Sequence, residues 1–289
     1  MPIEAWFLAL ASAGLFGLGL VITQFGFRNL TPALGAVFCM PTAALVFWAA
    51  APFIADFGGW DTRAALLFAF VGIFFPGAIT LLTFEANRLM GPYVSGALGN
   101  LAPMFAVAAA VLFLGEVLGW EQWAAIAVIV GGVSAISFQR HWQDRDWRRW
   151  VLIIPLGAAL CRGLAPPVLK IGFAWWPNPY VAILICYAVS ATVAISVALW
   201  RTRGGERRVT WIGAFWFSVV GLCNGFATLF FVMALALGPV SLVSPIVAAY
   251  PVFTLVFGGL LLRRTGIAAN QVIGVLLTVA GVILLISAG

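Results

Sequence analysis

The chain has 289 residues, of which 64% are apolar and only 8% carry a charged side chain. Soluble globular proteins are about 45–50% apolar and about 25% charged, so this composition excludes a water-soluble domain and predicts a membrane-embedded protein in contact with the lipid bilayer. The formal net charge is +6, but the basic residues fall in short loops between apolar runs. This placement predicts contact with lipid headgroups, with no nucleic acid as partner.

Apolar runs punctuated by Trp, Arg and Pro predict ten transmembrane helices joined by short loops. Almost continuous apolar stretches at 106–114 and 272–286 favour helices over the alternating, roughly ten-residue strands of a membrane barrel. The predicted fold is therefore an all-α integral membrane protein. In chain order, the ten predicted spans are residues 5–27, 33–54, 64–87, 92–114, 121–139, 149–172, 179–200, 210–236, 240–262 and 268–287.

Basic residues are distributed unevenly between the two sets of loops. Twelve arginines lie in the loops that follow the odd-numbered spans, whereas Arg63 and Lys170 belong to the other side and Arg162 lies within span six. Cytoplasmic loops carry an excess of Lys and Arg. We therefore predict a bacterial inner-membrane protein whose arginine-rich loops face the cytoplasm and whose two termini are periplasmic.

The two halves of the sequence repeat each other in order. Gly17 recurs 146 residues later as Gly163, and Gly132 recurs 149 residues later as Gly281. Further matched pairs are Gly26 with Gly172, Phe27 with Phe173, Pro32 with Pro179, Gly72 with Gly221, Gly91-Pro92 with Gly238-Pro239, Pro103 with Pro251, and Gln122 with Gln271. Each repeat holds five spans, and an odd number forces the two copies into opposite orientations. The predicted organisation is a five-helix repeat at 1–139, a basic cytoplasmic linker at 140–148 and a second five-helix repeat at 149–289.

Inverted repeats place a substrate site near the middle of the membrane, between the two halves, and expose it to each side in turn. The ionisable residue deepest in a predicted span is Arg162, where an unpaired charge is costly. Two roles are open for it. The guanidinium can hold a substrate carboxylate through a bidentate contact, or it can cap carbonyls of a helix broken around Gly163 and Pro166-Pro167.

Polar and aromatic residues at similar depth complete the candidate substrate site. They are Asn100, Asn224, Tyr250, Thr80 with Thr83, Tyr93 and Phe84. Asparagine in hydrocarbon also serves to join helices, so both roles are open for Asn100 and Asn224. Because proline removes a backbone donor, hinges or broken helices are predicted at Pro103, Pro166, Pro167, Pro245 and Pro251, and span six is predicted to be interrupted at Pro166-Pro167.

Residues for other kinds of chemistry are missing. The four cysteines and the single His141 show no metal-ligand spacing, and no hydrolase motif occurs, so we expect no metal, no cofactor and no enzymatic activity. No Asp or Glu lies in the middle of a predicted span, which disfavours proton-coupled export of cationic drugs. A small-molecule carrier or a passive channel remains.

A set of motifs resembles the EamA-type exporters of the drug/metabolite transporter superfamily. The motifs are the Gly-Pro openings of spans four and nine, Asn100-Leu101-Ala102-Pro103, Ser244-Pro245, Tyr250-Pro251, Gly115-Glu116, Gln122 and Gly131-Gly132. Within the superfamily, the chain is most similar to the YddG-type aromatic amino acid exporters. The resemblance implies export of amino acids, including aromatic ones, through a central cavity by alternating access. We also expect the protein to function as a monomer. The alternative is export of other metabolites or drugs, with proton coupling. One departure is that Arg263-Arg264 replaces Gly115-Glu116 in the second half.

Overall fold

The computed structural model describes residues 1–83, 85–86, 89, 98–137, 149–201, 209–262 and 268–288. These residues form helices joined by short loops and contain no strand. Eight helical segments are long and apolar enough to cross a membrane, and the two shorter apolar helices α5 and α6 bring the described spans to the predicted ten. The helices are α1 (Ile3–Gly26), α2 (Pro32–Ile54), α3 (Thr62–Gly72), η1 (Ile73–Ala78), α5 (Ala102–Leu114), α6 (Trp120–Ser137), η3 (Arg149–Leu152), α7 (Ile153–Trp175), α8 (Pro179–Arg201), α9 (Trp211–Leu237), α10 (Val240–Val247), α11 (Tyr250–Leu262) and α12 (Ala269–Ala288). The all-α prediction is confirmed.

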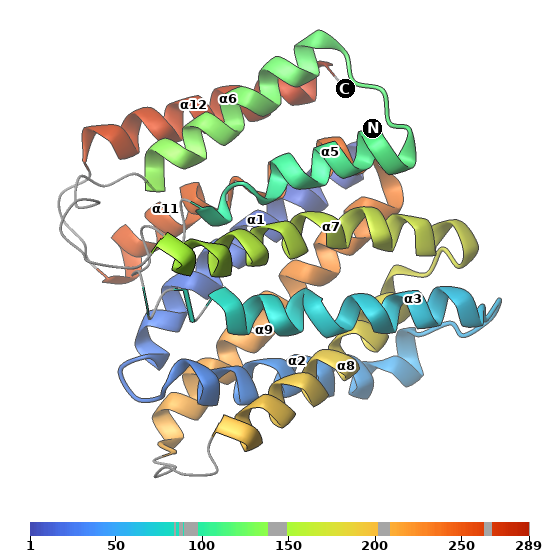
Figure 1. The fold of residues 1–289 in the computed structure, drawn as a ribbon, viewed down its shortest axis with the longest axis vertical. Coiled ribbons are helices and arrows are strands. Elements are labelled where there is room, and N and C mark those ends of the chain that lie inside the picture. The colour runs from blue at the N-terminus through green and yellow to red at the C-terminus, as the bar shows by residue number, and fades with distance from the viewer. Residues whose placement is uncertain are drawn as a thin grey trace.

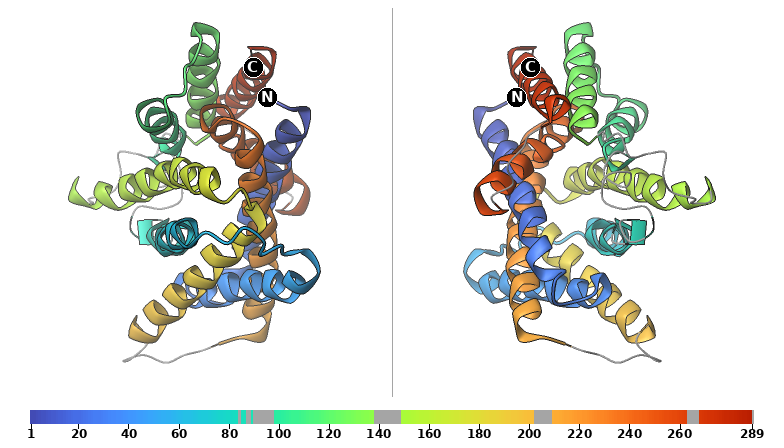
Figure 2. Two further views of the ribbon diagram at one scale, coloured as in Figure 1. Left: turned by 90° about the vertical axis from the view of Figure 1, so that its right-hand side faces the viewer. Right: turned by 90° about the vertical axis from the view of Figure 1, so that its left-hand side faces the viewer.

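The helices form two layers, and each layer draws helices from both repeats (Figures 1 and 2). In one layer α5, α7, α3 and α8 pack side by side in that order, and in the other α11, α1, α9 and α2 do the same. The two layers contain equivalent helices of the two repeats in the same order: α5 corresponds to α11, α7 to α1, α3 to α9 and α8 to α2. The layers meet along two rims, where α6 packs on α12 and α2 packs on α8. The fold thus consists of two inverted five-helix repeats with exchanged helices.

The repeated glycines occupy equivalent contacts in the two layers. A Cβ atom placed on Gly163 in α7 would lie 2.6 Å from the carbonyl oxygen of Ala102, at the start of α5. A Cβ atom placed on Gly17 in α1 would lie 2.9 Å from the carbonyl oxygen of Tyr250, at the start of α11. Two other pairs behave alike: Gly172 and Gly26 face the rings of Phe68 and Phe217, and Gly72 and Gly221 meet the backbones of Cys186 and Cys39. The sequence repeat is therefore a repeat of close helix contacts.

The matched glutamines have one shared role. The side-chain oxygen of Gln122 accepts a hydrogen bond from the backbone N–H of Gly119 at 3.0 Å, and that of Gln271 accepts one from Ala268 at 3.1 Å. Both bonds lie at the beginning of the last helix of a repeat, where the first backbone N–H groups lack partners within the helix. A glutamine at this place therefore helps to start α6 and α12.

The rim between α6 and α12 offers a matched pair of substitutions. A Cβ atom on Gly132 would lie 2.6 Å from the backbone nitrogen of Thr278, whereas nothing lies within 4 Å of one on the adjacent Gly131. We expect Gly132→Ala to destabilise the protein by about 1–3 kcal/mol through overpacking. Gly131→Ala should be neutral or stabilise it by up to about 1 kcal/mol, because alanine is the better helix former. Thermal unfolding of the purified variants in detergent checks this, and equal melting temperatures would show that the rim is loosely packed.

Spans four and nine are both broken near their middle. Ala248 and Ala249 form a turn between α10 and α11, and Asn100 and Leu101 form the equivalent turn before α5. Pro103 and Pro251 occupy the second residues of α5 and α11. A proline there costs no hydrogen bond because the first N–H groups of a helix have no acceptor within it. Pro245 lies inside α10, before the break.

Span six differs from its prediction. The helix α7 runs from Ile153 to Trp175 without a break, and both Pro166 and Pro167 lie buried within it. The predicted interruption at Pro166-Pro167 is therefore corrected. The reason is that the fixed φ of proline suits a helix and only two backbone hydrogen bonds are lost, while neighbouring helices hold the segment in place.

Both termini lie at the same end of the bundle (Figure 1). This end, which we call the terminal face, also holds the ends of α5, α7 and α9. The end of α1, the start of α2 and the end of α8 lie at the opposite end of the bundle (Figure 1). We call this end the arginine face, because the sequence places arginines in the segments that follow such helix ends. The predicted linker 140–148 lies outside the described residues.

Candidate functional site

Arg162 lies on α7, one residue before the glycine that packs against the start of α5. Its side chain is half-buried, and its Nη2 donates a long hydrogen bond of 3.4 Å to the hydroxyl of Thr83. Within the described residues this hydroxyl is the hydrogen-bond partner of the guanidinium. A guanidinium has five N–H donors, so this contact leaves most of them for other acceptors. The Arg162–Thr83 pair thus leaves donors free for an anionic ligand.

Thr80 lies one turn before Thr83 and is tied to its own helix. Its hydroxyl donates to the carbonyl oxygen of Pro76 at 2.8 Å. This acceptor lies in η1, where span three is kinked because Phe75 leaves helical geometry with φ −124° and ψ 118°. The kink in span three therefore determines where Thr80 and Thr83 lie.

Asn100 is buried and lies in the break of span four. Its amide donates to the carbonyl oxygen of Val133 in α6 at 3.2 Å. The side chain therefore joins the broken span to the neighbouring helix. This contact favours the interhelical role for Asn100, which membrane asparagines commonly have.

Asn224 and Tyr250 lie on different sides of α1. A Cβ atom on Gly19 would lie 2.6 Å from the side-chain oxygen of Asn224, whereas one on Gly17 would meet the backbone of Tyr250 at 2.9 Å. Positions two apart on an α-helix point in nearly opposite directions, because each residue turns the helix by about 100°. The two candidates therefore do not meet, and α1 lies between α9 and α11.

The six candidate residues that the structure describes consequently do not form one cluster. Arg162 lies close to the segment of Thr80 and Thr83, and Asn100 turns to α6. Phe84 and Tyr93 lie outside the described residues.

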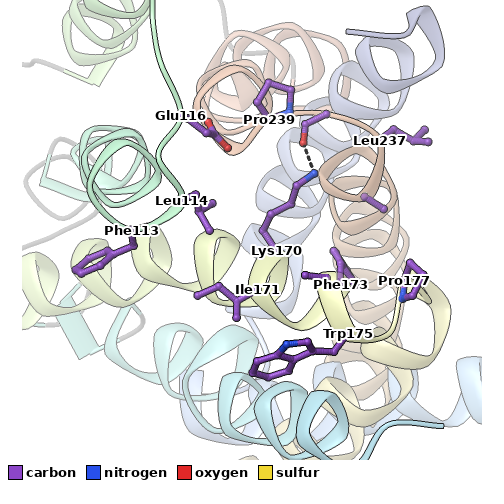
Figure 3. A pocket seen from close by; sticks show the side chains of 13 residues that line it. Phe113, Leu114, Glu116, Lys170, Ile171, Phe173, Trp175, Pro177, Leu237 and Pro239 are labelled. Atoms are coloured by element: carbon purple, nitrogen blue, oxygen red, sulfur yellow. Dashed lines mark hydrogen bonds between the residues drawn. The ribbon is translucent and has the colours of Figure 1, made fainter. Parts of the chain in front are cut away.

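A second region of interest is a cavity of about 760 Å³ at the terminal face, between the ends of α5 and α7 and the turn from α9 to α10 (Figure 3). Its walls include Phe113, Ile171 and Trp175, and its polar groups are Glu116 and Lys170. We call it the outer pocket. The combination of apolar walls with a few polar groups is typical of ligand pockets.

Lys170, the one lysine of the sequence, caps the end of α9. Its Nζ donates to the carbonyl oxygens of Leu235 at 2.6 Å and Gly238 at 2.8 Å. The last carbonyls of a helix lack partners and carry partial negative charge, so an ammonium group is favourable there. Lys170 thereby holds the end of α9 against α7.

Glu116 binds the start of α10 from the other side. One carboxylate oxygen accepts the backbone N–H of Val240 at 2.8 Å, and the other accepts that of Ser241 at 2.9 Å and also its hydroxyl. Gly115, which ends α5 with φ +67°, turns the chain into this position. A carboxylate at a helix N-terminus satisfies free N–H groups and the helix dipole.

The sequence alone did not reveal the roles of Glu116 and Lys170. Two signals pointed toward them: Gly115-Glu116 has no counterpart in the second repeat, and Gly238-Pro239 interrupts the apolar run. Neither signal says which helices meet at the turn, so the partners could be identified only from the fold.

Comparison with known proteins identifies the family. The profile of the EamA-like transporter family matches the chain twice, over residues 4–138 and 148–287. The chain belongs to the EamA-like transporter family. A solved crystal structure of another protein shares the fold, with a TM-score of 0.78 over 100% of this chain and 98% of that chain at 17% sequence identity. No curated protein matches the sequence.

Membership in the EamA-like family makes this chain a multi-pass membrane transporter of small molecules and not an enzyme. Each of the two family matches contains five of the spans, in agreement with the equivalent glycine contacts of the two repeats.

Proposed function

We propose that this transporter exports amino acids, including aromatic ones, across the bacterial inner membrane by alternating access. The observation that carries the proposal is the Arg162–Thr83 pair: a half-buried guanidinium in a membrane-spanning helix, with one long hydrogen bond from the described residues. A charge at this depth is costly unless it faces a hydrated path or a counter-ion. A carboxylate supplies that counter-ion through a planar, bidentate contact.

In this proposal, the substrate enters from the cytoplasm at the arginine face, and both termini are periplasmic, as the excess of arginine at one face favours. Two repeats, 1–139 and 149–289, joined by the linker 140–148, form a monomeric carrier. The substrate binds between the layers, and the layers rock about the rims formed by α6 with α12 and α2 with α8.

The preference for aromatic amino acids rests on the sequence resemblance to YddG-type exporters. Asn224, Tyr250, Thr80, Tyr93 and Phe84 keep their proposed substrate role, with Arg162 as the residue that faces the carboxylate. Asn100 is assigned to the contact with α6.

Ligand-dependent stability of the purified protein tests this proposal. Phenylalanine should raise the melting temperature in a concentration-dependent way, because a ligand that binds only the folded state stabilises it. Phenylalaninol, which lacks the carboxylate, should have no effect, and Arg162→Gln should lose the response to phenylalanine. Equal shifts with both compounds would contradict the carboxylate contact. Stabilisation only by other metabolites or by drugs would favour the alternative substrate classes.

A further inference from the structure

The turn between α9 and α10 is held at both of its ends by charged side chains from the opposite layer. Lys170 on α7 binds the last carbonyls of α9, and Glu116, which follows α5, binds the first N–H groups of α10. Both α5 and α7 belong to one layer, whereas α9 belongs to the other and the buried α10 contacts both. The two side chains thus connect the layers at the terminal face.

We infer that Glu116 and Lys170 form a latch that closes the terminal face and must release the α9–α10 turn before substrate leaves. This inference rests on the proposed alternating-access function and extends it to a specific gate. The layers cannot separate freely at this face while the contacts persist, because Lys170 holds the end of α9 in the other layer and Glu116 holds the start of α10, which is joined to α9. Charge-assisted hydrogen bonds to helix ends are among the strong ones in proteins.

The two residues of the latch have no counterpart of the same type in the opposite repeat. In the second repeat, Arg263-Arg264 stands at the position equivalent to Gly115-Glu116, and Gln24 stands at the position equivalent to Lys170. An arginine has no acceptor for the N–H groups of a helix start, so Arg264 cannot take the role of Glu116.

The outer pocket lies directly beside the latch. Glu116 and Lys170 both line it, together with Phe113, Ile171 and Trp175 (Figure 3). Release of the α9–α10 turn would widen this pocket toward the space between the layers. The pocket thus becomes the exit vestibule of the open state, with aromatic and aliphatic walls that suit an apolar side chain.

The opening of the latch can be measured as a distance between spin labels at Val117, in the loop after α5, and Leu237, at the end of α9. Val117 is 93% exposed and Leu237 is 47% exposed, so labels at both positions reach solvent. Cys161 and Cys223 are replaced by alanine beforehand, whereas the buried Cys39 and Cys186 remain. The labelled protein is measured in proteoliposomes without substrate, so the readout does not depend on transport.

Glu116→Ala and Lys170→Met should each add a longer distance and raise the ratio of open to closed protein by about tenfold or more, as expected for the loss of hydrogen bonds to a charged group. Glu116→Gln, which keeps an acceptor oxygen, should shift the ratio less. The control is Glu121→Ala, which removes an exposed carboxylate at the start of α6 and should leave the distances unchanged.

The latch is overturned if Glu116→Ala and Lys170→Met give the same distances as Glu121→Ala. If Glu116→Ala does not yield folded protein, Glu116→Gln and Lys170→Met decide the question. A distance shift in a protein that transports no amino acid would support the latch and contradict the proposed substrate. Unchanged distances with intact amino acid export would contradict the latch alone.

Discussion

Arg162→Ala is expected to abolish saturable amino acid transport while the protein remains folded in the membrane. A hydrogen bond to a charged group contributes about 1.5–3 kcal/mol, so losing a bidentate contact should weaken substrate binding by roughly 100-fold or more. Arg162→Lys keeps the charge but loses the planar guanidinium group. Its affinity for the substrate should therefore lie between that of the parent protein and that of Arg162→Ala. The measurement is the concentration dependence of transport in proteoliposomes that contain equal amounts of each variant.

Arg63→Ala is the matched control for this series, because Arg63 is exposed at the terminal face near the start of α3. Its removal should leave the kinetics unchanged. Transport by Arg162→Ala with the same half-saturating concentration as the parent protein would show that Arg162 does not hold the substrate, and would favour its alternative role as a cap within the helix bundle.

Gly163→Ala is expected to destabilise the protein more than most single substitutions. An added Cβ would lie 2.5 Å from the Cβ of Phe105 and 2.6 Å from the carbonyl oxygen of Ala102. Neither atom is the end of a flexible side chain, so α5 and α7 must move apart. Overpacking of this kind costs about 1–3 kcal/mol, and Gly163→Val should cost more.

The repeat supplies a second test of the same contact. Gly17→Ala should lower the melting temperature to a similar degree, because Gly17 packs on α11 as Gly163 packs on α5. Gly157→Ala is the control within α7, since nothing lies within 4 Å of its added Cβ. A Gly163 variant as stable as the Gly157 variant would contradict the close approach of α5 and α7.

Composition and periodicity predicted the all-α fold, the ten spans and their duplication, because these features follow from apolar runs and repeated residues along the chain. The matched glycines indicated close contacts, but their partners depend on which helices exchange between the layers. Gly163 and Gly17 thus make equivalent contacts in the structure, whereas the sequence shows only that they are 146 residues apart. The continuity of α7 through Pro166-Pro167 was missed because proline was judged by its lost donor and not by the packing around it.

The candidate site was harder to predict than the fold. Depth along a span identified Arg162 and Asn100 as buried polar residues, but depth alone cannot distinguish a side chain that faces a substrate from one that binds another helix. Asn100 binds α6, whereas Arg162 has Thr83 as its partner among the described residues. Glu116 and Lys170 were not recognised because their partners are backbone groups at helix ends. Backbone groups are the same in almost every residue, so no residue type indicates them in the sequence.

The most direct test of the central claim is counterflow of labelled phenylalanine in proteoliposomes preloaded with unlabelled amino acid, with and without an imposed pH gradient. The proposed carrier should show saturable uptake that depends on the internal amino acid and not on the pH gradient. Absence of uptake would contradict amino acid transport, uptake without saturation or counterflow would indicate a channel, and uptake driven by the gradient would contradict the uncoupled mechanism.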